Sequence, residues 1–323
     1  FLGIFGYEIL QELKDVDIYR LLDYIDIGNF AYVTGSLIMG NKNYPVINAD
    51  DLDLFVRIAK HGFVDMDYIY RFAYRGRKKR TKDERLLQLE RYKYLLINRT
   101  FIPPDYTVNY RIGYKIIALG KAAIELLADY DMQAADHAAG IKISSPYRMY
   151  HQVQVSTICD ILQQKYNESD RSNWEVVQIL NEKEAYIDDT GNQPDAALIF
   201  KSKQSQGNAI MVFLEIERSY ASNASLIRKL NGYALSISKK LYTGRISYNL
   251  VEQRVLFVTQ TKLQQEALLC KLKKLDAHGL HLYVSSFQEV AKTPLDQVYT
   301  VPYVLEPKFR LLSKYPDLSL ENV

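Results

Sequence analysis

The chain has 323 residues, of which 48% are hydrophobic, and its formal net charge is +3. A chain of this length is expected to form two or three domains, and its small net charge excludes a globally basic nucleic-acid-binding protein, so any such surface must be local. Its two cysteines, Cys159 and Cys270, lie in apolar helical patterns and suggest neither a disulfide framework nor a metal knuckle. No apolar run reaches membrane-spanning length and no leader-like segment is evident, so we expect a soluble, cytoplasmic protein without a membrane partner.

Residues 1–50 are the least interpretable part of the sequence. Apolar residues at helical spacing between Tyr7 and Tyr24 predict one or two short helices, whereas residues 29–44 show no clear period. We therefore expect a helical extension here and assign it no function.

Three helices are predicted at the start of residues 51–130. The first begins at residues 51–53 and ends at His61-Gly62, because glycine commonly terminates a helix. Asp65 is a candidate N-cap for the second helix, and the third begins near Thr81 with an apolar stripe along one side.

Two β-like runs follow, at residues 96–102 and 108–119, with a turn at Pro103-Pro104-Asp105 between them. A closing helix is predicted over residues 121–130. Three helices, a two-stranded wing and a closing helix are typical of a winged helix-turn-helix domain, which we assign to residues 51–130.

Basic residues are concentrated between residues 75 and 99, where ten lysines and arginines stand against three acidic residues. Such a surface neutralises phosphates and makes binding salt-dependent. The third helix of a winged helix enters the major groove, where Gln88 would read an adenine edge and Arg85 a guanine edge. The alternatives are a solvated basic loop and a winged helix that binds protein. The residues that we predict to contact DNA are Arg75, Arg77, Lys78, Lys79, Arg80, Lys82, Arg85, Gln88, Arg91 and Lys93.

The rest of the chain is predicted to form an α/β domain over residues 150–290. Small residues over 131–149 indicate a linker. Beyond it, helices and strands follow in the order α-β-β-β-α-β-α-β, which favours a mixed sheet with some parallel pairing. Residues 291–323 contain four prolines and are predicted to form a surface strap or a mobile end.

The most informative stretch is residues 194–233. Asp195 stands at the head of one apolar strand, and a second strand over 210–217 carries Glu215 and Glu217. Alternate residues of a strand point to opposite faces, so both glutamates share the face of Met211 and Phe213. Carboxylates on a mostly apolar face are costly unless they are paired, solvated or bound to a cation.

A helix over residues 223–241 then offers Lys229 and, one turn later, Tyr233. Asp195, Glu215 and Lys229 in this order resemble the PD-(D/E)XK nuclease superfamily, in which an Asp and a Glu on adjacent strands hold a divalent metal and a Lys positions water. The resemblance implies an α+β fold and a Mg²⁺ or Mn²⁺ site on Asp195 and Glu215. It also implies a catalytic set, active or vestigial, of Asp195, Glu215, Glu217 and Lys229.

The third motif position departs from that superfamily, because Glu217 stands where the lysine belongs. Lys229 would have to supply the missing amine from the helix. The alternative is that Glu215 and Glu217 lie on a solvated edge of the sheet, paired with Arg218 or Arg228.

Both halves together resemble the replication-relaxation family of Gram-positive mobile elements. The motifs are Pro194-Asp195-Ala196, the acidic strand Phe213–Arg218, the helix segment Lys229–Tyr233, and His151 ahead of the linking helix. The resemblance spans roughly residues 51–290. It implies a role in plasmid replication and relaxation of plasmid DNA, with a relaxase or a replication initiator as partner.

Three functions follow from these features. We favour a DNA-binding accessory protein of plasmid or integrative-element replication, relaxation and conjugative mobilisation, docked on double-stranded DNA through the winged helix. The alternatives are a Mg²⁺- or Mn²⁺-dependent endonuclease that nicks DNA, and a transcriptional regulator. The sequence also leaves a homodimer open.

Overall fold

The computed structural model describes residues 45–100, 114–129, 145–186, 189–204, 207–218, 221–242, 244–275, 279–304 and 308–314. The predicted extension before residue 45, the proline turn at 103–105 and most of the predicted linker lie outside these ranges. The described residues form an α+β protein with one antiparallel and one mixed sheet.

The N-terminal half, from Ala49 to Asp129, contains the predicted helices, wing strands and closing helix. Its elements are α4 (Ala49–His61), β1 (Val64–Asp65), α5 (Met66–Phe72), α6 (Lys79–Arg91), β2 (Leu95–Thr100), β3 (Tyr114–Leu119) and α7 (Lys121–Asp129). The prediction missed the short strand β1, which pairs with β3 and completes a sheet of order β1-β3-β2.

Local capping explains where these helices begin and end. The side chain of Asn48 accepts a hydrogen bond from the Asp51 backbone N–H, so α4 begins earlier than predicted. Asp65 caps α5 as predicted, with its carboxylate 2.7 Å from the backbone nitrogen of Tyr68. Gly62 follows α4 with a φ of 80°, a conformation that favours glycine.

The C-terminal half, from Pro146 to Ser313, has the predicted order of helices and strands, followed by one short helix that was not predicted. Its elements are α9 (Pro146–Glu168), β4 (Trp174–Asn181), β5 (Ala196–Ser202), β6 (Asn208–Glu217), α10 (Asn223–Ser238), β7 (Asn249–Thr259), α11 (Lys262–Leu272), β8 (His281–Ser286) and α12 (Phe287–Lys292). The sheet order is β4-β5-β6-β7-β8, antiparallel from β4 to β6 and parallel from β6 to β8, which confirms the predicted mixed sheet.

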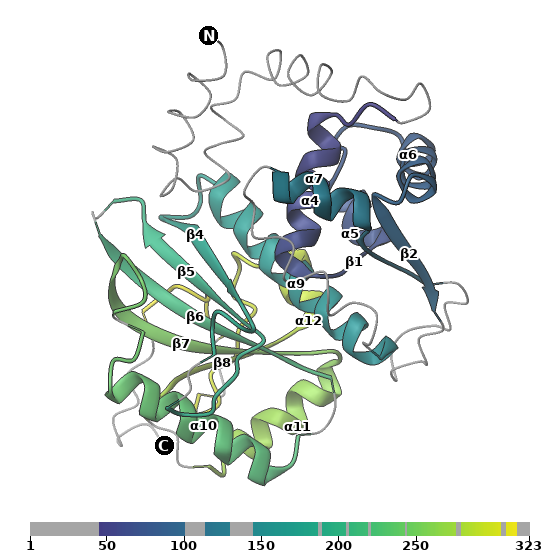
Figure 1. The fold of residues 1–323 in the computed structure, drawn as a ribbon. Coiled ribbons are helices and arrows are strands. Elements are labelled where there is room, and N and C mark those ends of the chain that lie inside the picture. Colours follow the sequence, from purple (N-terminus) through teal and green to yellow (C-terminus); the bar gives the residue numbers. More distant parts are fainter. Residues whose placement is uncertain are drawn as a thin grey trace.

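Helices cover both faces of this sheet (Figure 1). Met211 and Phe213 of β6 pack on the face covered by α10 and α11, and Val212 and Leu214 pack on the face covered by α9 and α12. The predicted division of β6 into two faces is therefore confirmed, and it places Glu215 on the side of α10.

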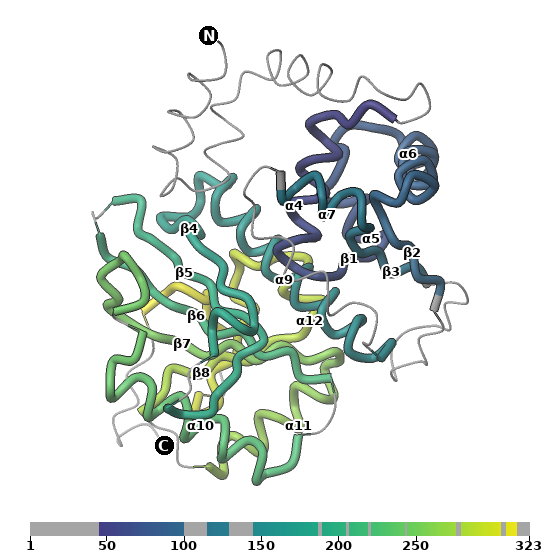
Figure 2. The backbone as a smooth tube through the Cα atoms, in the orientation of Figure 1, coloured from purple at the N-terminus to yellow at the C-terminus, as the bar shows by residue number. Residues whose placement is uncertain are grey.

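Helix α9 joins the two halves (Figure 2). It is capped by Ser145 and begins at Pro146, so the last residues assigned to the linker are helical. Val155 and Leu162 pack on the mixed sheet, whereas Ile161 packs in the core of the N-terminal half. A single helix thus contributes to both cores. Among the described residues, no helix combines the length and apolar character needed to cross a membrane.

The prediction of a strap or mobile end beyond residue 290 is wrong for its described part. Tyr299, Val301 and Leu311 are fully buried on the α9 side of the sheet. The buried guanidinium of Arg254 donates to the backbone oxygens of Leu311 and Ser313 and fixes this segment. The core of the C-terminal half therefore extends beyond the predicted boundary at residue 290.

Candidate functional site

The hairpin of β5 and β6 positions the first acidic residue. Asp195 immediately precedes β5, and its backbone N–H donates to the oxygen of Leu214 at 3.1 Å. Its carboxylate accepts from the backbone nitrogen of Ile216 at 2.7 Å, and its other oxygen lies 2.9 Å from Nε2 of His151 on α9. Both oxygens of Asp195 are therefore engaged, one by the strand and one by the helix between the halves.

The second part of the site lies between β6 and α10. Lys229 donates to Oε2 of Glu215 at 2.6 Å and to Oε1 of Glu217 at 2.9 Å. Tyr233, one turn later, donates to Oε1 of Glu215 at 2.5 Å. The structure therefore brings the predicted carboxylates of β6 and the predicted lysine together, and Asp195 interacts electrostatically with Glu215.

The solvated-edge alternative for these glutamates is wrong. Glu215 is only 1% exposed, and its cationic partner is Lys229 rather than Arg218 or Arg228. Burial raises the pKa of Glu215 to about 7 despite the opposing effect of the nearby ammonium. Burial acts to lower the pKa of Lys229, but the two carboxylates outweigh it and the pKa is raised.

These residues do not fit a divalent metal as they stand. The two oxygens of Glu215 accept from Tyr233 and Lys229, and those of Asp195 are taken by His151 and Ile216. Within the described ranges, no three His, Cys, Asp or Glu side chains are grouped so that they could hold a metal ion. The Lys229 ammonium supplies the positive charge that a metal would bring to Glu215 and Glu217.

Two of the predicted DNA contacts are buried or paired inside the N-terminal half. Lys82 is 5% exposed and donates to the backbone oxygens of Tyr70 and Ala73 at 3.1 and 2.7 Å. Arg85 forms an ion pair with the fully buried Asp51 of α4. Both side chains therefore attach α6 to its own domain and are engaged by protein rather than exposed for contact with DNA.

The other predicted DNA contacts lie on the surface. Three of them form exposed ion pairs, Arg75 with Glu168, Arg77 with Asp50 and Arg80 with Glu84, and such pairs contribute little to stability. The predicted DNA contacts that are exposed are Arg75, Arg77, Lys78, Lys79, Arg80, Gln88, Arg91 and Lys93.

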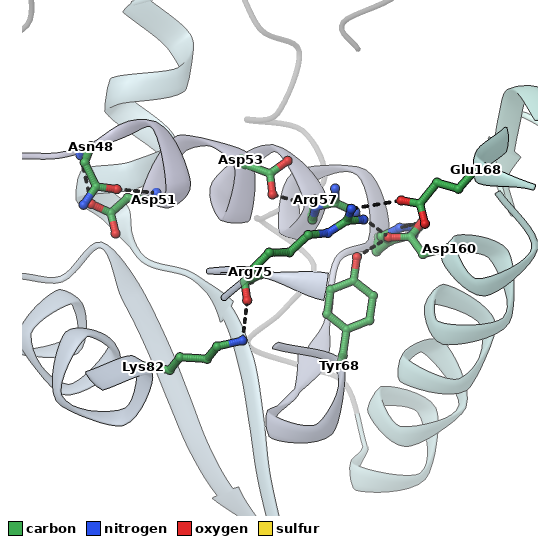
Figure 3. A network of polar contacts seen from close by, with 11 residues as sticks. Asn48, Asp51, Asp53, Arg57, Tyr68, Arg75, Lys82, Asp160 and Glu168 are labelled. Atoms are coloured by element: carbon green, nitrogen blue, oxygen red, sulfur yellow. Dashed lines mark hydrogen bonds and ion pairs between the residues drawn. The ribbon is translucent and has the colours of Figure 1, made fainter. Parts of the chain in front are cut away.

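A buried polar network between the halves had no signal in the sequence. Asp160 of α9 is 2% exposed and lies 2.9 Å from Nε2 of His61 and 3.1 Å from Nη1 of Arg57. The Tyr68 hydroxyl also donates to Asp160 (Figure 3). Burial acts to raise the pKa of Asp160, but His61 and the nearby cations Lys60 and Arg57 outweigh it and hold the pKa well below its ordinary value.

A family profile described as replication-relaxation matches residues 55–247, from α4 of the N-terminal half to the segment before β7. The match includes the basic surface around α6 and all the residues of the acidic site. No curated protein matches the chain.

Proposed function

The chain belongs to the replication-relaxation family, and from this membership we propose that it is a DNA-docking accessory protein rather than a nuclease. The family associates it with replication and relaxation of mobile elements. In this proposal the N-terminal half docks on double-stranded DNA, and the acidic site is a structural ion-pair cluster.

The order of elements in the N-terminal half supports docking. Helix, strand, two helices and two strands follow in the sequence of a winged helix-turn-helix domain, with α6 as its third helix. Lys78 and Lys79 at the start of α6, and Arg91 and Lys93 at its end, are exposed. These positions are suited to phosphates on both sides of a groove, with Gln88 between them.

The observation that carries the choice against catalysis is the double ion pair of Lys229. A nuclease needs carboxylate oxygens available to a metal and an amine available to water. Here the same amine holds Glu215 and Glu217, and Tyr233 occupies the second oxygen of Glu215. These contacts favour a binding or structural role for the acidic site.

The experiment incubates supercoiled DNA with the full chain and Mn²⁺ or Mg²⁺, with Glu215→Gln in parallel. We expect intact supercoils with both proteins, together with salt-sensitive binding to duplex DNA of unchanged affinity. Nicking by the wild-type protein that is abolished by Glu215→Gln would overturn the proposal.

A metal-dependent endonuclease is the second candidate, because Asp195, Glu215 and Lys229 converge as that chemistry requires. In this case the metal would have to displace Lys229 from Glu215 and His151 from Asp195. Metal-dependent nicking lost in both Asp195→Asn and Glu215→Gln would establish it.

We also propose that the protein works beside a relaxase or a replication initiator. The support is the family description, which joins replication and relaxation. Co-purification of such a protein with the wild-type chain, lost when the exposed basic residues of α6 are removed or when DNA is digested, would show that DNA bridges the two. Persistence after digestion would show a direct protein contact.

A further inference from the structure

A cavity of about 670 Å³ lies between the two halves of the molecule. Its walls come from α5, α9, the start of α11 and α12, which are four elements from both halves. The volume is within the range of small-molecule sites, about 300–1,000 Å³. None of the residues of the acidic site lines it.

The buried Gln154 and the partly buried Gln260 line this cavity, and their side-chain amides are incompletely bonded. Gln154 of α9, which is 3% exposed, donates from Nε2 to Oε1 of Gln260 at 2.6 Å. Within the described chain, Oε1 of Gln154 and Nε2 of Gln260 are buried without a hydrogen-bond partner. If both side-chain amides are turned by half a turn, one buried acceptor and one buried donor are again left without a partner. Each unsatisfied group costs roughly 1–3 kcal/mol, so buried pairs of this kind are normally completed by a ligand or water.

The two amides, which are hydrogen-bonded to each other, leave one donor and one acceptor, and these are the groups that the edge of a nucleobase pairs with. Every base presents a neighbouring N–H and acceptor on its Watson–Crick edge when it is unpaired. Tyr150 and Phe287 line the same cavity and offer flat surfaces on which a base stacks.

Cations and aromatic rings continue from the cavity toward the surface. Arg71 and Lys262 line the cavity. The guanidinium of Arg218 lies 4.8 Å from the centre of the Tyr150 ring and 6.0 Å from that of Tyr147, whose side chain is half exposed. Alternating cations and aromatic rings are the usual surface for the backbone and bases of single-stranded nucleic acid.

Acidic side chains also line the cavity and argue against a phosphate inside it. Asp65 caps α5, and Glu289 is paired with Lys308 and caps α12, whereas Asp67 belongs to the first turn of α5. These carboxylates offset the charges of Arg71 and Lys262. The cavity is therefore suited to an uncharged base, with the phosphates left at the surface.

From these contacts we propose that the cavity between the halves holds an unpaired base of single-stranded DNA. Gln154 and Gln260 bind the base edge, Tyr150 stacks on its ring, and Arg218 follows the strand outward. The inference rests on the proposed function in one respect only, that the protein works on DNA.

The test measures binding of a fluorescent oligothymidylate of about 12 nucleotides to the full-length chain, with duplex DNA measured in the same samples. The double variant Gln154→Leu/Gln260→Leu is expected to lose about tenfold or more of the single-strand affinity and to keep its duplex affinity. Its melting temperature should stay equal or rise, because two unsatisfied amides are removed. Gln164→Leu, on the same helix but outside the cavity, is the matched control and should leave both affinities unchanged.

Tyr150→Leu provides a second variant that keeps an apolar side chain. This substitution should weaken single-strand binding severalfold. An abasic probe should bind the wild-type chain as weakly as the oligothymidylate binds the double variant. Equal single-strand affinity in wild type and both variants would overturn the inference and indicate that the amides hold only water. Displacement of the probe by equimolar deoxynucleoside monophosphate would overturn the single-strand assignment in favour of a free nucleotide.

The duplex measurement separates the two proposals. Amide-dependent single-strand binding without duplex binding would overturn the docking function and leave this inference standing. Duplex binding without single-strand binding would overturn this inference and leave the docking function standing.

Discussion

The ammonium nitrogen of Lys229 lies 2.6 Å from Oε2 of Glu215, a carboxylate that is 1% exposed. A buried charge is tolerated when it is paired and its remaining oxygen is hydrogen-bonded, and the hydroxyl of Tyr233 provides that second contact. The relationship joins α10 to β6 and makes the acidic site part of the core. Substitutions of its residues should therefore change the stability of the fold more directly than any catalytic activity.

Replacing Lys229 by Met is expected to destabilise the fold by about 3 kcal/mol at neutral pH, because Glu215 is left buried without its cation. Urea unfolding followed by circular dichroism measures the change. The exposed Lys239, at the end of the same helix, gives the control Lys239→Met, which should shift stability by no more than about 0.5 kcal/mol. Equal stability of the two variants would show that the ion pair contributes nothing.

The pH dependence of stability should identify Glu215. Its pKa is raised by burial from an ordinary 4.5 to about 7, so the folded protein holds this proton more tightly than the unfolded chain. The resulting stability is fully present below pH 4.5 and is lost as the pH rises through about 7. The free energy of unfolding of the wild-type protein should therefore fall relative to that of Glu215→Gln across this window, by up to about 3 kcal/mol. A difference in the free energy of unfolding between the two proteins that does not change with pH would contradict the raised pKa of Glu215.

The pH dependence of stability that arises from Asp160 should have the opposite sign. Its pKa is held below the ordinary 3.8, so its contribution is present above that pH and is lost as the pH falls further. Asp160→Asn is expected to lose about 3 kcal/mol near neutral pH, because Arg57 and the buried His61 lose the negative charge that they share. Unfolding of the two halves should then separate into two transitions. The exposed Asp170, just beyond α9, gives the control Asp170→Asn, for which one transition is expected.

Substitutions on α6 should separate DNA contact from packing. Lys79→Ala and Arg91→Ala are each expected to weaken duplex binding and to reduce the slope of log affinity against log salt by about 1. Lys82→Met should leave that slope unchanged and lower stability by about 1–2 kcal/mol, because two backbone oxygens lose their donor. Fluorescence anisotropy at several salt concentrations and thermal unfolding measure these effects. A changed slope in Lys82→Met alone would reverse the assignment.

The acidic site was predictable because its parts are close in sequence. A hairpin and the helix after it place Asp195, Glu215 and Lys229 together with little freedom, and alternation along β6 assigns the face. The network around Asp160 was not predictable, because its partners on α4 and α5 lie about a hundred residues earlier and meet it only through tertiary packing.

The composition of the sequence located the basic surface but could not distinguish its exposed residues from those that pack inside the domain. Lys82 and Arg85 look like their neighbours in the sequence, yet their positions on α6 turn them toward α5 and α4. Proline content was likewise misleading beyond residue 290, because the apolar residues between the prolines determine that this segment packs on the sheet.

The buried guanidinium of Arg254 determines where the protein can safely be shortened. Its acceptors include the backbone oxygens of Leu311 and Ser313, and β7, to which it belongs, is hydrogen-bonded along its length to β6. A fragment cut at residue 247, where the family match ends, would expose the edge of β6 and discard two of the five strands of the mixed sheet. Recombinant versions should therefore retain Ser313, since the evolutionary unit recognised by sequence is smaller than the unit that folds.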